Sequence, residues 1–227
     1  FNYGCHGVVM GNENLQTTAD WIGAASQTLQ AEPSIDTAVF LQGCCGNINP
    51  RIRGTFEDVK KAGDMVAGPV LDSMKSARPV SGDIRIAWRS VFRREELEKK
   101  RAQGAPPAAL HVDSAMLMWA RDALDVLEDD DGSGTQPISV QGIRLGELMI
   151  VALPGEAFCE IGLQIKQMRS GPTFVVGYAN GNVGYIPTAE AYQEGGYETD
   201  VAYKFYGTRM IGPESEALVV TAAAEGS

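Results

Sequence analysis

Residues 177–200 read Gly177-Tyr-Ala-Asn-Gly-Asn-Val-Gly-Tyr-Ile-Pro-Thr-Ala-Glu-Ala-Tyr-Gln-Glu-Gly-Gly-Tyr-Glu-Thr-Asp200 and directly follow the apolar, strand-like run Thr173–Val176. The stretch contains four tyrosines and five glycines but almost no aliphatic side chains, so it can form neither a core strand nor an amphipathic helix. Glycine permits positive φ and close backbone approach, while phenols donate hydrogen bonds and, once deprotonated, bind metal. The composition fits a surface loop equally well, so other segments must decide between a loop and a site.

The size and charge of the chain restrict its fold and its partners. With 227 residues, 44% of them hydrophobic, it can bury a core as one large domain or two small ones. A net charge of −10 argues against nucleic acid, whose phosphates need a basic face, and less strongly against anionic membranes. No apolar run reaches the roughly 18 residues of a transmembrane helix, and no signal-peptide pattern is present. Because the sequence begins at Phe1 rather than Met, we expect an upstream segment to be missing.

Strand-like and helical patterns alternate along the chain, which predicts a layered α/β fold of mixed sheets flanked by helices. Helical periodicity is found in residues 17–30, 56–74, 93–103, 113–127, 157–168 and 215–224. Strand-like runs are found in residues 2–10, 37–41, 83–92, 138–145 and 148–153. The last two strands are predicted to pair through a turn at Gly146-Glu147, and a helix break is expected near Gly63, Gly68 and Pro69. No internal repeat or clean domain linker is visible.

The four cysteines, Cys5, Cys44, Cys45 and Cys159, are predicted to be free, packed thiols. Neighbouring Cα atoms lie about 3.8 Å apart, which is below the usual disulfide range and argues against a Cys44–Cys45 bridge. The absence of a CxxC pair argues against a structural zinc knuckle. The cysteines leave the cellular compartment open.

His6 and Glu156 are the strongest candidates for site residues outside the Tyr/Gly stretch. A strand places Cys5 and His6 on opposite faces, and of the two His6 is the better metal ligand. Glu156 follows an apolar strand and is predicted to open a helix, whose N-terminal dipole stabilises the charged form of a carboxylate. A packed histidine and a helix-capping glutamate explain both residues without a function. Tyr185 and Tyr197 add phenols, but no local metal motif such as HExxH joins the four.

Four segments, taken together and in this order, resemble the neutral (non-lysosomal) ceramidase family of zinc amidases. They are Cys5-His6-Gly-Val-Val-Met10, Phe40-Leu-Gln-Gly-Cys-Cys-Gly-Asn-Ile-Asn-Pro50, Leu153-Pro-Gly-Glu156, and the stretch from Gly177 through Glu198, which contains Tyr185-Ile-Pro-Thr-x-Glu-x-Tyr-x-x-x-x-Tyr197-Glu198. The last segment is the most specific, since it is similar to the family's Tyr-Ile-Thr-Thr-x-Glu-Glu-Tyr-x-x-x-x-Tyr-Glu. The resemblance covers most of the chain.

The resemblance implies a function and a set of site residues. By matching position, His6, Glu156 and Tyr185 would be zinc ligands, and Tyr197 would polarise the substrate carbonyl. The remaining ligand in the family is a histidine upstream of the His6 motif. Residues 1–227 would then be the C-terminal part of a single ceramidase-like catalytic domain whose upstream segment is missing. The family relationship allows a secreted or periplasmic location and does not exclude the cytoplasm.

Two departures from the family pattern bear on activity. Asn49 stands where the family has a serine implicated in catalysis, which excludes a serine nucleophile here but leaves a zinc-and-water mechanism and a substrate-binding role for Asn49. The chain is also shorter than a ceramidase, so we expect a small-molecule N-acyl or lipid-like amide as substrate, and not necessarily ceramide. The sequence therefore leads to two hypotheses: a zinc-dependent amide hydrolase, and a non-catalytic ceramidase-like binding protein.

Overall fold

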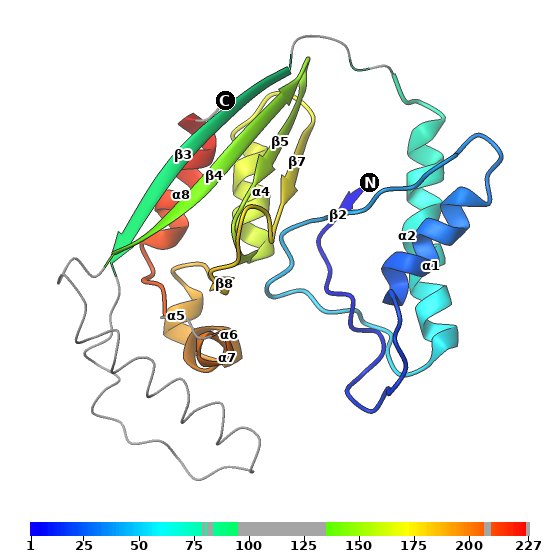
Figure 1. Cartoon of the computed structure of the whole chain (residues 1–227), viewed down its shortest axis with the longest axis horizontal. Coiled ribbons are helices and arrows are strands. Elements are labelled where there is room, and N and C mark those ends of the chain that lie inside the picture. The colour runs from blue at the N-terminus through cyan, green and yellow to red at the C-terminus, as the bar shows by residue number, and fades with distance from the viewer. Residues whose placement is uncertain (79, 81–83, 95–134, 207–209, 226–227) are drawn as a thin grey trace.

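The computed structural model of the protein describes residues 1–78, 80, 84–94, 135–206 and 210–225, with the backbone alone for 84–94 and 135–137 (Figure 1). The predicted layered α/β fold is confirmed. Its largest sheet has the strand order β3-β4-β5-β7, formed by β3 (Ile84–Arg94), β4 (Thr135–Leu145), β5 (Leu148–Ala152) and β7 (Thr173–Val176). Helices α4 (Cys159–Gln167) and α8 (Ser215–Glu225) pack beside each other against this sheet.

The centre of the large sheet follows the hydrophobic pattern of the sequence. β4 and β5 are antiparallel and turn at Gly146, which has a φ of 58°, so the predicted hairpin is confirmed. β5 and β7 are parallel, and α4 makes the crossover between them, as parallel pairing requires. The main hydrophobic core lies between this sheet and its two helices, and its fully buried side chains include Leu153, Ile161 and Val219.

Two smaller sheets connect the large sheet to the N-terminal part of the chain. β1 (Asn2–Tyr3) pairs in parallel with β2 (Leu41–Gln42), and β6 (Glu156–Ala157) pairs in parallel with β8 (Tyr185–Ile186). The side-chain amide of Asn2 donates to Leu41 O at 3.0 Å and to Val175 O at 3.1 Å. This residue therefore joins the first small sheet to the edge strand of the large one.

The helices α1 (Asp20–Gln30) and α2 (Phe56–Met74) form a second, smaller core with the N-terminal residues. Thr55 caps α2 through a capping box with Asp58, which explains the sharp start of this helix. The predicted break is wrong, because α2 runs through Pro69 without interruption. Pro69 and Met65, four residues before it, are both exposed, so water can satisfy the carbonyl that the proline leaves unbonded.

Gly63 and Gly68 lie in the same helix, and we expect opposite effects from replacing them. A Cβ at Gly63 would lie 2.6 Å from Ala24 Cβ and 2.6 Å from Ala25 N, so α1 and α2 touch there backbone to backbone. Gly63→Ala should lower the free energy of unfolding by about 1–3 kcal/mol through overpacking. A Cβ at Gly68 would meet nothing within 4 Å, so Gly68→Ala should raise the free energy of unfolding by about 0.5–1 kcal/mol. Urea titrations of both variants test this pair, and equal shifts of one sign would contradict it.

Other expected elements are shorter than predicted or begin elsewhere. The strand expected at 2–10 shrinks to β1, because the Asp20 carboxylate takes the backbone N–H groups of Val9 and Met10 that a neighbouring strand would need. The strand expected at 37–41 is reduced to β2. The helix expected at 93–103 is wrong at its start, since β3 extends to Arg94. The rest of that helix and the one expected at 113–127 lie outside the described residues. Within the described ranges, no helix combines the length and apolar character that crossing a membrane demands.

Candidate functional site

Four loops converge where strands of the large sheet and the first small sheet end. Residues 4–10 follow β1, 43–50 follow β2, 153–155 follow β5 and 177–184 follow β7. Backbone hydrogen bonds join them: His6 N donates to Ile48 O at 3.0 Å, Gly177 N to Gln42 O at 2.9 Å, and Tyr178 N to Gly155 O at 3.0 Å. Ligands in α/β sheets bind outside the carboxyl ends of strands, which makes this meeting point the first place to look for a site.

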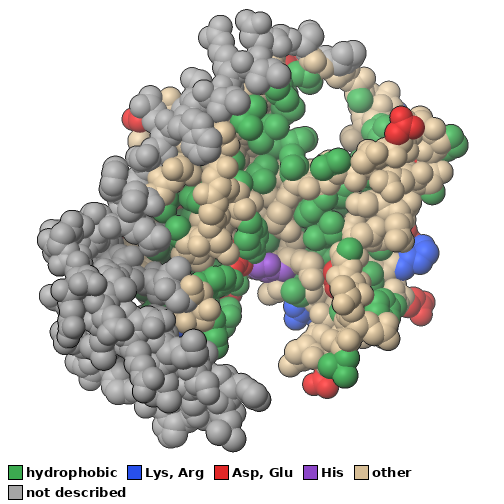
Figure 2. Space-filling model, viewed as in Figure 1, with side chains coloured by type: hydrophobic (Ala, Val, Ile, Leu, Met, Phe, Trp, Pro, Cys, Tyr) green, Lys and Arg blue, Asp and Glu red, His purple; other side chains and the backbone are tan. Residues whose placement is uncertain are grey.

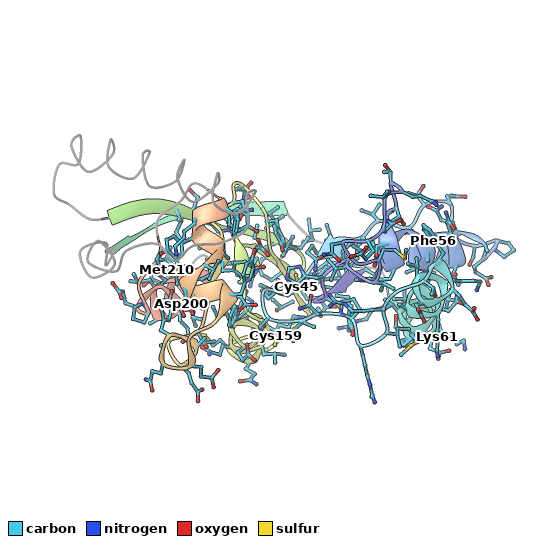
Figure 3. All side chains as sticks on the ribbon, turned by 90° about the horizontal axis from the view of Figure 1, so that it is seen from below. Cys45, Phe56, Lys61, Cys159, Asp200 and Met210 are labelled. Atoms are coloured by element: carbon cyan, nitrogen blue, oxygen red, sulfur yellow. The ribbon has the colours of Figure 1, made fainter. Side chains whose placement is uncertain are left out.

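The surface is hollowed at this meeting point. Figure 2 shows a recess between the N-terminal part and the part built on the large sheet, with a histidine side chain visible at its floor. Seen from below, Cys45 lies near the middle of the molecule, with Phe56 and Lys61 on one side and Asp200 and Met210 on the other (Figure 3). The four loops, which are joined by backbone hydrogen bonds, therefore connect the two parts.

His6 is held in place through its backbone. Trp21, which is buried in α1, donates its indole N–H to His6 O at 2.8 Å. The Asp20 carboxylate accepts from Val9 N at 3.0 Å and fixes the same loop three residues further on. The imidazole stays partly exposed, with a side-chain exposure of 18%. His6 thus has a fixed backbone and a ring that can reach a ligand.

Glu156 lies in β6, not at the start of a helix as predicted; α4 begins at Cys159, after Phe158 as N-cap. β6 is clamped on both sides, since Gly46 N donates to Ala157 O at 3.0 Å and Glu156 N donates to Gly184 O at 2.9 Å. The Glu156 side chain is only 3% exposed. Its position is therefore set by strand pairing rather than by a helix dipole.

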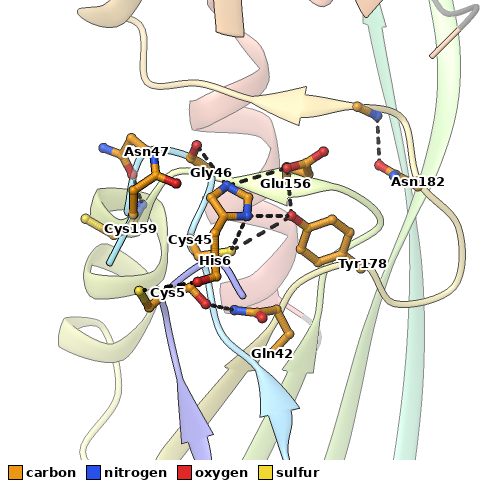
Figure 4. Close-up of polar contacts among 12 residues, drawn as sticks. Cys5, His6, Gln42, Cys45, Gly46, Asn47, Glu156, Cys159, Tyr178 and Asn182 are labelled. Carbon is orange, nitrogen blue, oxygen red and sulfur yellow. Dashed lines mark hydrogen bonds and ion pairs between the residues drawn. The ribbon is translucent and has the colours of Figure 1, made fainter. Parts of the chain in front are cut away.

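The Glu156 carboxylate lies beside the Tyr178 phenol and the His6 imidazole (Figure 4). Tyr178 donates to Oε2 at 2.6 Å, and Tyr206 donates to Oε1. His6 Nε2 lies 3.8 Å from Oε2. Among the residues that the structure describes, His6 is the one basic side chain within ion-pair distance of Glu156. The carboxylate is thus hydrogen-bonded but poorly neutralised.

Tyr185 and Tyr197 stand next to this carboxylate. Tyr185 is the register partner of Glu156 in the β6–β8 pair, and its ring packs edge-on against Tyr197 at 6.1 Å and against Tyr206 at 6.2 Å. Burial, followed by the nearby Glu156 charge, raises the pKa of Tyr185 well above its ordinary value. The same two causes, with Glu198 third, raise the pKa of Tyr197. Both phenols therefore keep their protons at neutral pH unless a cation replaces them.

Asn49 does not join this group through any contact found in the described residues. Its side chain is exposed, and its amide oxygen accepts from the guanidinium of Arg53 at 3.4 Å. Among the sequence-derived candidates, His6, Glu156, Tyr185 and Tyr197 are brought together, whereas Asn49 lies on the outer side of its loop.

Sequence reasoning missed three residues that touch the group: Cys45, Tyr178 and Tyr206. The Cys45 Sγ lies 3.7 Å from His6 Nδ1 and 3.9 Å from the Tyr178 hydroxyl. Burial above all raises the pKa of Cys45 to about 11, so it is a thiol rather than a thiolate. Tyr178 belongs to the Tyr/Gly stretch, but only the contacts of the folded chain distinguish it from Tyr192, whose hydroxyl donates to Ile211 O at 2.6 Å.

The donor set fits zinc in part. Imidazole nitrogen and carboxylate oxygen are ordinary zinc ligands, and a phenol oxygen can join them after losing its proton. A buried carboxylate is normally paired with a cation or bound to metal, and within the described part of the chain the one basic group near Glu156 is the His6 imidazole. However, the described residues contain no group of three or more His, Cys, Asp or Glu side chains that could hold an ion. A complete centre would need a donor from outside that part of the chain.

The fold is of the kind seen in ceramidases. The structure described as "Ceramidase complexed with C2" has a TM-score of 0.67 and 15% identity over 98% of this chain and 44% of that one. Neutral ceramidase from Pseudomonas aeruginosa has a TM-score of 0.62 and 20% identity over 98% of this chain and 43% of that one. The chain thus spans less than half the length of these neighbours. No protein-family model and no curated protein matches the sequence.

Proposed function

We propose that this chain belongs to a zinc-dependent hydrolase that cleaves an N-acyl amide bond. The observation that carries the proposal is the meeting of His6, Glu156 and Tyr185, which come from three distant segments of the sequence, at the carboxyl ends of strands. The resemblance of the segments that carry them to the ceramidase family, together with a fold similar to that of ceramidases, supports the same chemistry. The fourth zinc ligand lies outside the described residues in this proposal, and residues 1–227 form part of one catalytic domain.

His6 Nε2, the Glu156 carboxylate and the Tyr185 oxygen would hold the ion. Zinc supplies Lewis acidity to an amide carbonyl and makes water a nucleophile near neutral pH. Tyr197 would donate its hydroxyl proton as a hydrogen bond to the oxygen on which negative charge develops. Its raised pKa suits this role, because the phenol keeps the proton that it must donate. Asn49 has no step in this proposed mechanism, although its exposed amide could hydrogen-bond a substrate.

The mouth of the site suits an acyl group. Tyr178, Tyr197 and Tyr206 are 38%, 50% and 39% exposed, and Phe205 beside Tyr206 is 45% exposed. Aromatic rings offer a large apolar surface with fixed geometry, which an N-acyl chain can cover. A lipid-like amide is therefore the preferred substrate class.

The second candidate is a ceramidase-like binding protein without catalysis. It is favoured by the hydrogen bonds of Tyr178 and Tyr206, which satisfy both oxygens of Glu156 without any metal. In such a protein the pocket would bind the amide and leave it intact. Zinc uptake and turnover separate the two candidates.

The deciding experiment is zinc analysis followed by a substrate panel. The purified protein should hold about one zinc per chain. It should hydrolyse at least one of a set of lipid and non-lipid N-acyl amides, lose turnover in a strong chelator and recover it when zinc is returned. Undiminished hydrolysis by the chelated protein would overturn the zinc proposal. Tight zinc binding without turnover of any amide would favour the binding protein.

A further inference from the structure

Tyr178 has the most unusual backbone conformation of the residues at this site. Its φ of 54° is in the left-handed region, which bulky side chains rarely occupy. Asp20 and Asn180 are the other described non-glycine residues with positive φ, and Asp and Asn tolerate it far better than Tyr. Strained backbone of this kind persists where surrounding contacts enforce it, and it gathers at functional sites. The loop therefore keeps a tyrosine where a glycine would fit with less strain.

The strained backbone of Tyr178 places its hydroxyl between Glu156 and His6. The Tyr178 hydroxyl donates to Glu156 Oε2 at 2.6 Å, and the same oxygen lies 3.5 Å from His6 Nδ1. One hydroxyl thus bridges two of the proposed ligands. Its single proton is committed to Glu156, so its lone pairs face the imidazole. Tyr178 N is also anchored, because it donates to Gly155 O in the loop just before Glu156.

The two nitrogens of His6 face different surroundings. Nε2 is turned towards Gly46 O, 3.4 Å away, and Glu156 Oε2, 3.8 Å away, whereas Nδ1 faces the Tyr178 hydroxyl and Cys45 Sγ. A histidine that binds metal through one nitrogen normally donates the N–H of the other to a fixed acceptor, which sets its tautomer and ring orientation. The Tyr178 oxygen occupies that acceptor position for Nδ1, with the Cys45 sulfur beside it.

From this arrangement we infer that Tyr178 is a positioning residue, which orients His6 and Glu156 together for cation binding. The inference rests on the proposed function and deepens it, since the resemblance to ceramidases assigns no role to Tyr178. The hydroxyl acts through the two ligands and needs no contact with the substrate. Tyr206 is different, because it bonds Glu156 Oε1 and has no hydrogen bond to His6 among the described residues.

The test compares three Tyr→Phe variants, with zinc alone as the probe. Tyr178→Phe should weaken zinc binding about 10–100-fold in competition with a chromophoric chelator, the usual cost of losing an outer-shell partner. Tyr206→Phe removes a hydrogen bond to Glu156 alone and should weaken zinc binding less. Tyr192→Phe loses a hydroxyl that is hydrogen-bonded to Ile211 O. It is the matched control and should leave zinc affinity unchanged. Unchanged affinity in Tyr178→Phe would overturn the inference.

A second readout needs no metal and separates this inference from the proposed function. The sequence has two histidines, so ring 15N NMR signals of His6 can be assigned by comparison with His6→Gln. In metal-free protein, Tyr178→Phe should shift the His6 ring signals and change its tautomer ratio, while Tyr206→Phe and Tyr192→Phe should not. If the wild type binds no zinc, the proposed function fails and this readout still decides the role of Tyr178. Identical His6 spectra in all variants would overturn that role.

Discussion

Glu156→Ala is expected to abolish both zinc binding and amide hydrolysis. The carboxylate is the hub of the site: it accepts hydrogen bonds from Tyr178 and Tyr206 and is the nearest acid to His6. Its removal takes away a direct ligand, so zinc affinity should fall by more than the roughly 100-fold that a missing outer-shell partner costs. It also leaves two phenol donors without their acceptor in a site where the side chain is only 3% exposed.

Zinc affinity measured against a competing chelator checks this expectation directly. Glu194→Ala is the matched control, because that carboxylate lies in the same Tyr/Gly stretch but is exposed, and the variant should behave as wild type. Glu156→Gln keeps the side-chain shape and an oxygen acceptor, which separates loss of charge from loss of packing. Wild-type zinc affinity in Glu156→Ala with an intact fold would rule out the proposed metal centre.

Local pattern accounts for much of the fold. β4, β5 and α8 lie close to their predicted positions, since each buries one face and the burial repeats with the period of its own element. Local pattern fails where tertiary contacts override it. Pro69 should have ended α2, but packing of Val59, Gly63 and Ala67 against α1 holds the helix together. These contacts span distant segments and leave no trace in a short window of sequence.

The residues of the site also fall into two groups: those that sequence motifs predict and those that only the folded chain identifies. His6, Glu156, Tyr185 and Tyr197 could be nominated from motifs that resemble a family, and the fold brings them together. Tyr178 and Cys45 could not be nominated, because their roles depend on distances of 2.6 Å to Glu156 and 3.7 Å to His6 that only the folded chain creates. The prediction that Glu156 opens a helix failed because Gly46 and Gly184 pair with the segment as strands do.

Gly46→Ala is expected to be among the most destabilising single-methyl changes in this chain. A Cβ at Gly46 would lie 2.4 Å from Glu156 O and 2.9 Å from Phe158 Cδ1, and the first of these is rigid strand backbone. Either the 43–50 loop or β6 must move, although Gly46 N now donates to Ala157 O at 3.0 Å. Overpacking of this kind should lower the free energy of unfolding by about 3 kcal/mol.

The stabilisation that alanine brings through the unfolded state is too small to compensate for this overpacking. Replacing glycine by alanine restricts the unfolded chain and gains only about 0.4–1 kcal/mol. Gly11→Ala isolates that gain, since a Cβ there meets nothing within 4 Å, and it should be neutral or slightly stabilising in the same urea titration. Because His6 N is bonded to Ile48 O in the displaced loop, Gly46→Ala should also move the imidazole away from Glu156 and weaken zinc binding. A variant as stable as wild type would show that the two segments are not in close backbone contact, and the clamp that positions Glu156 would then need another explanation.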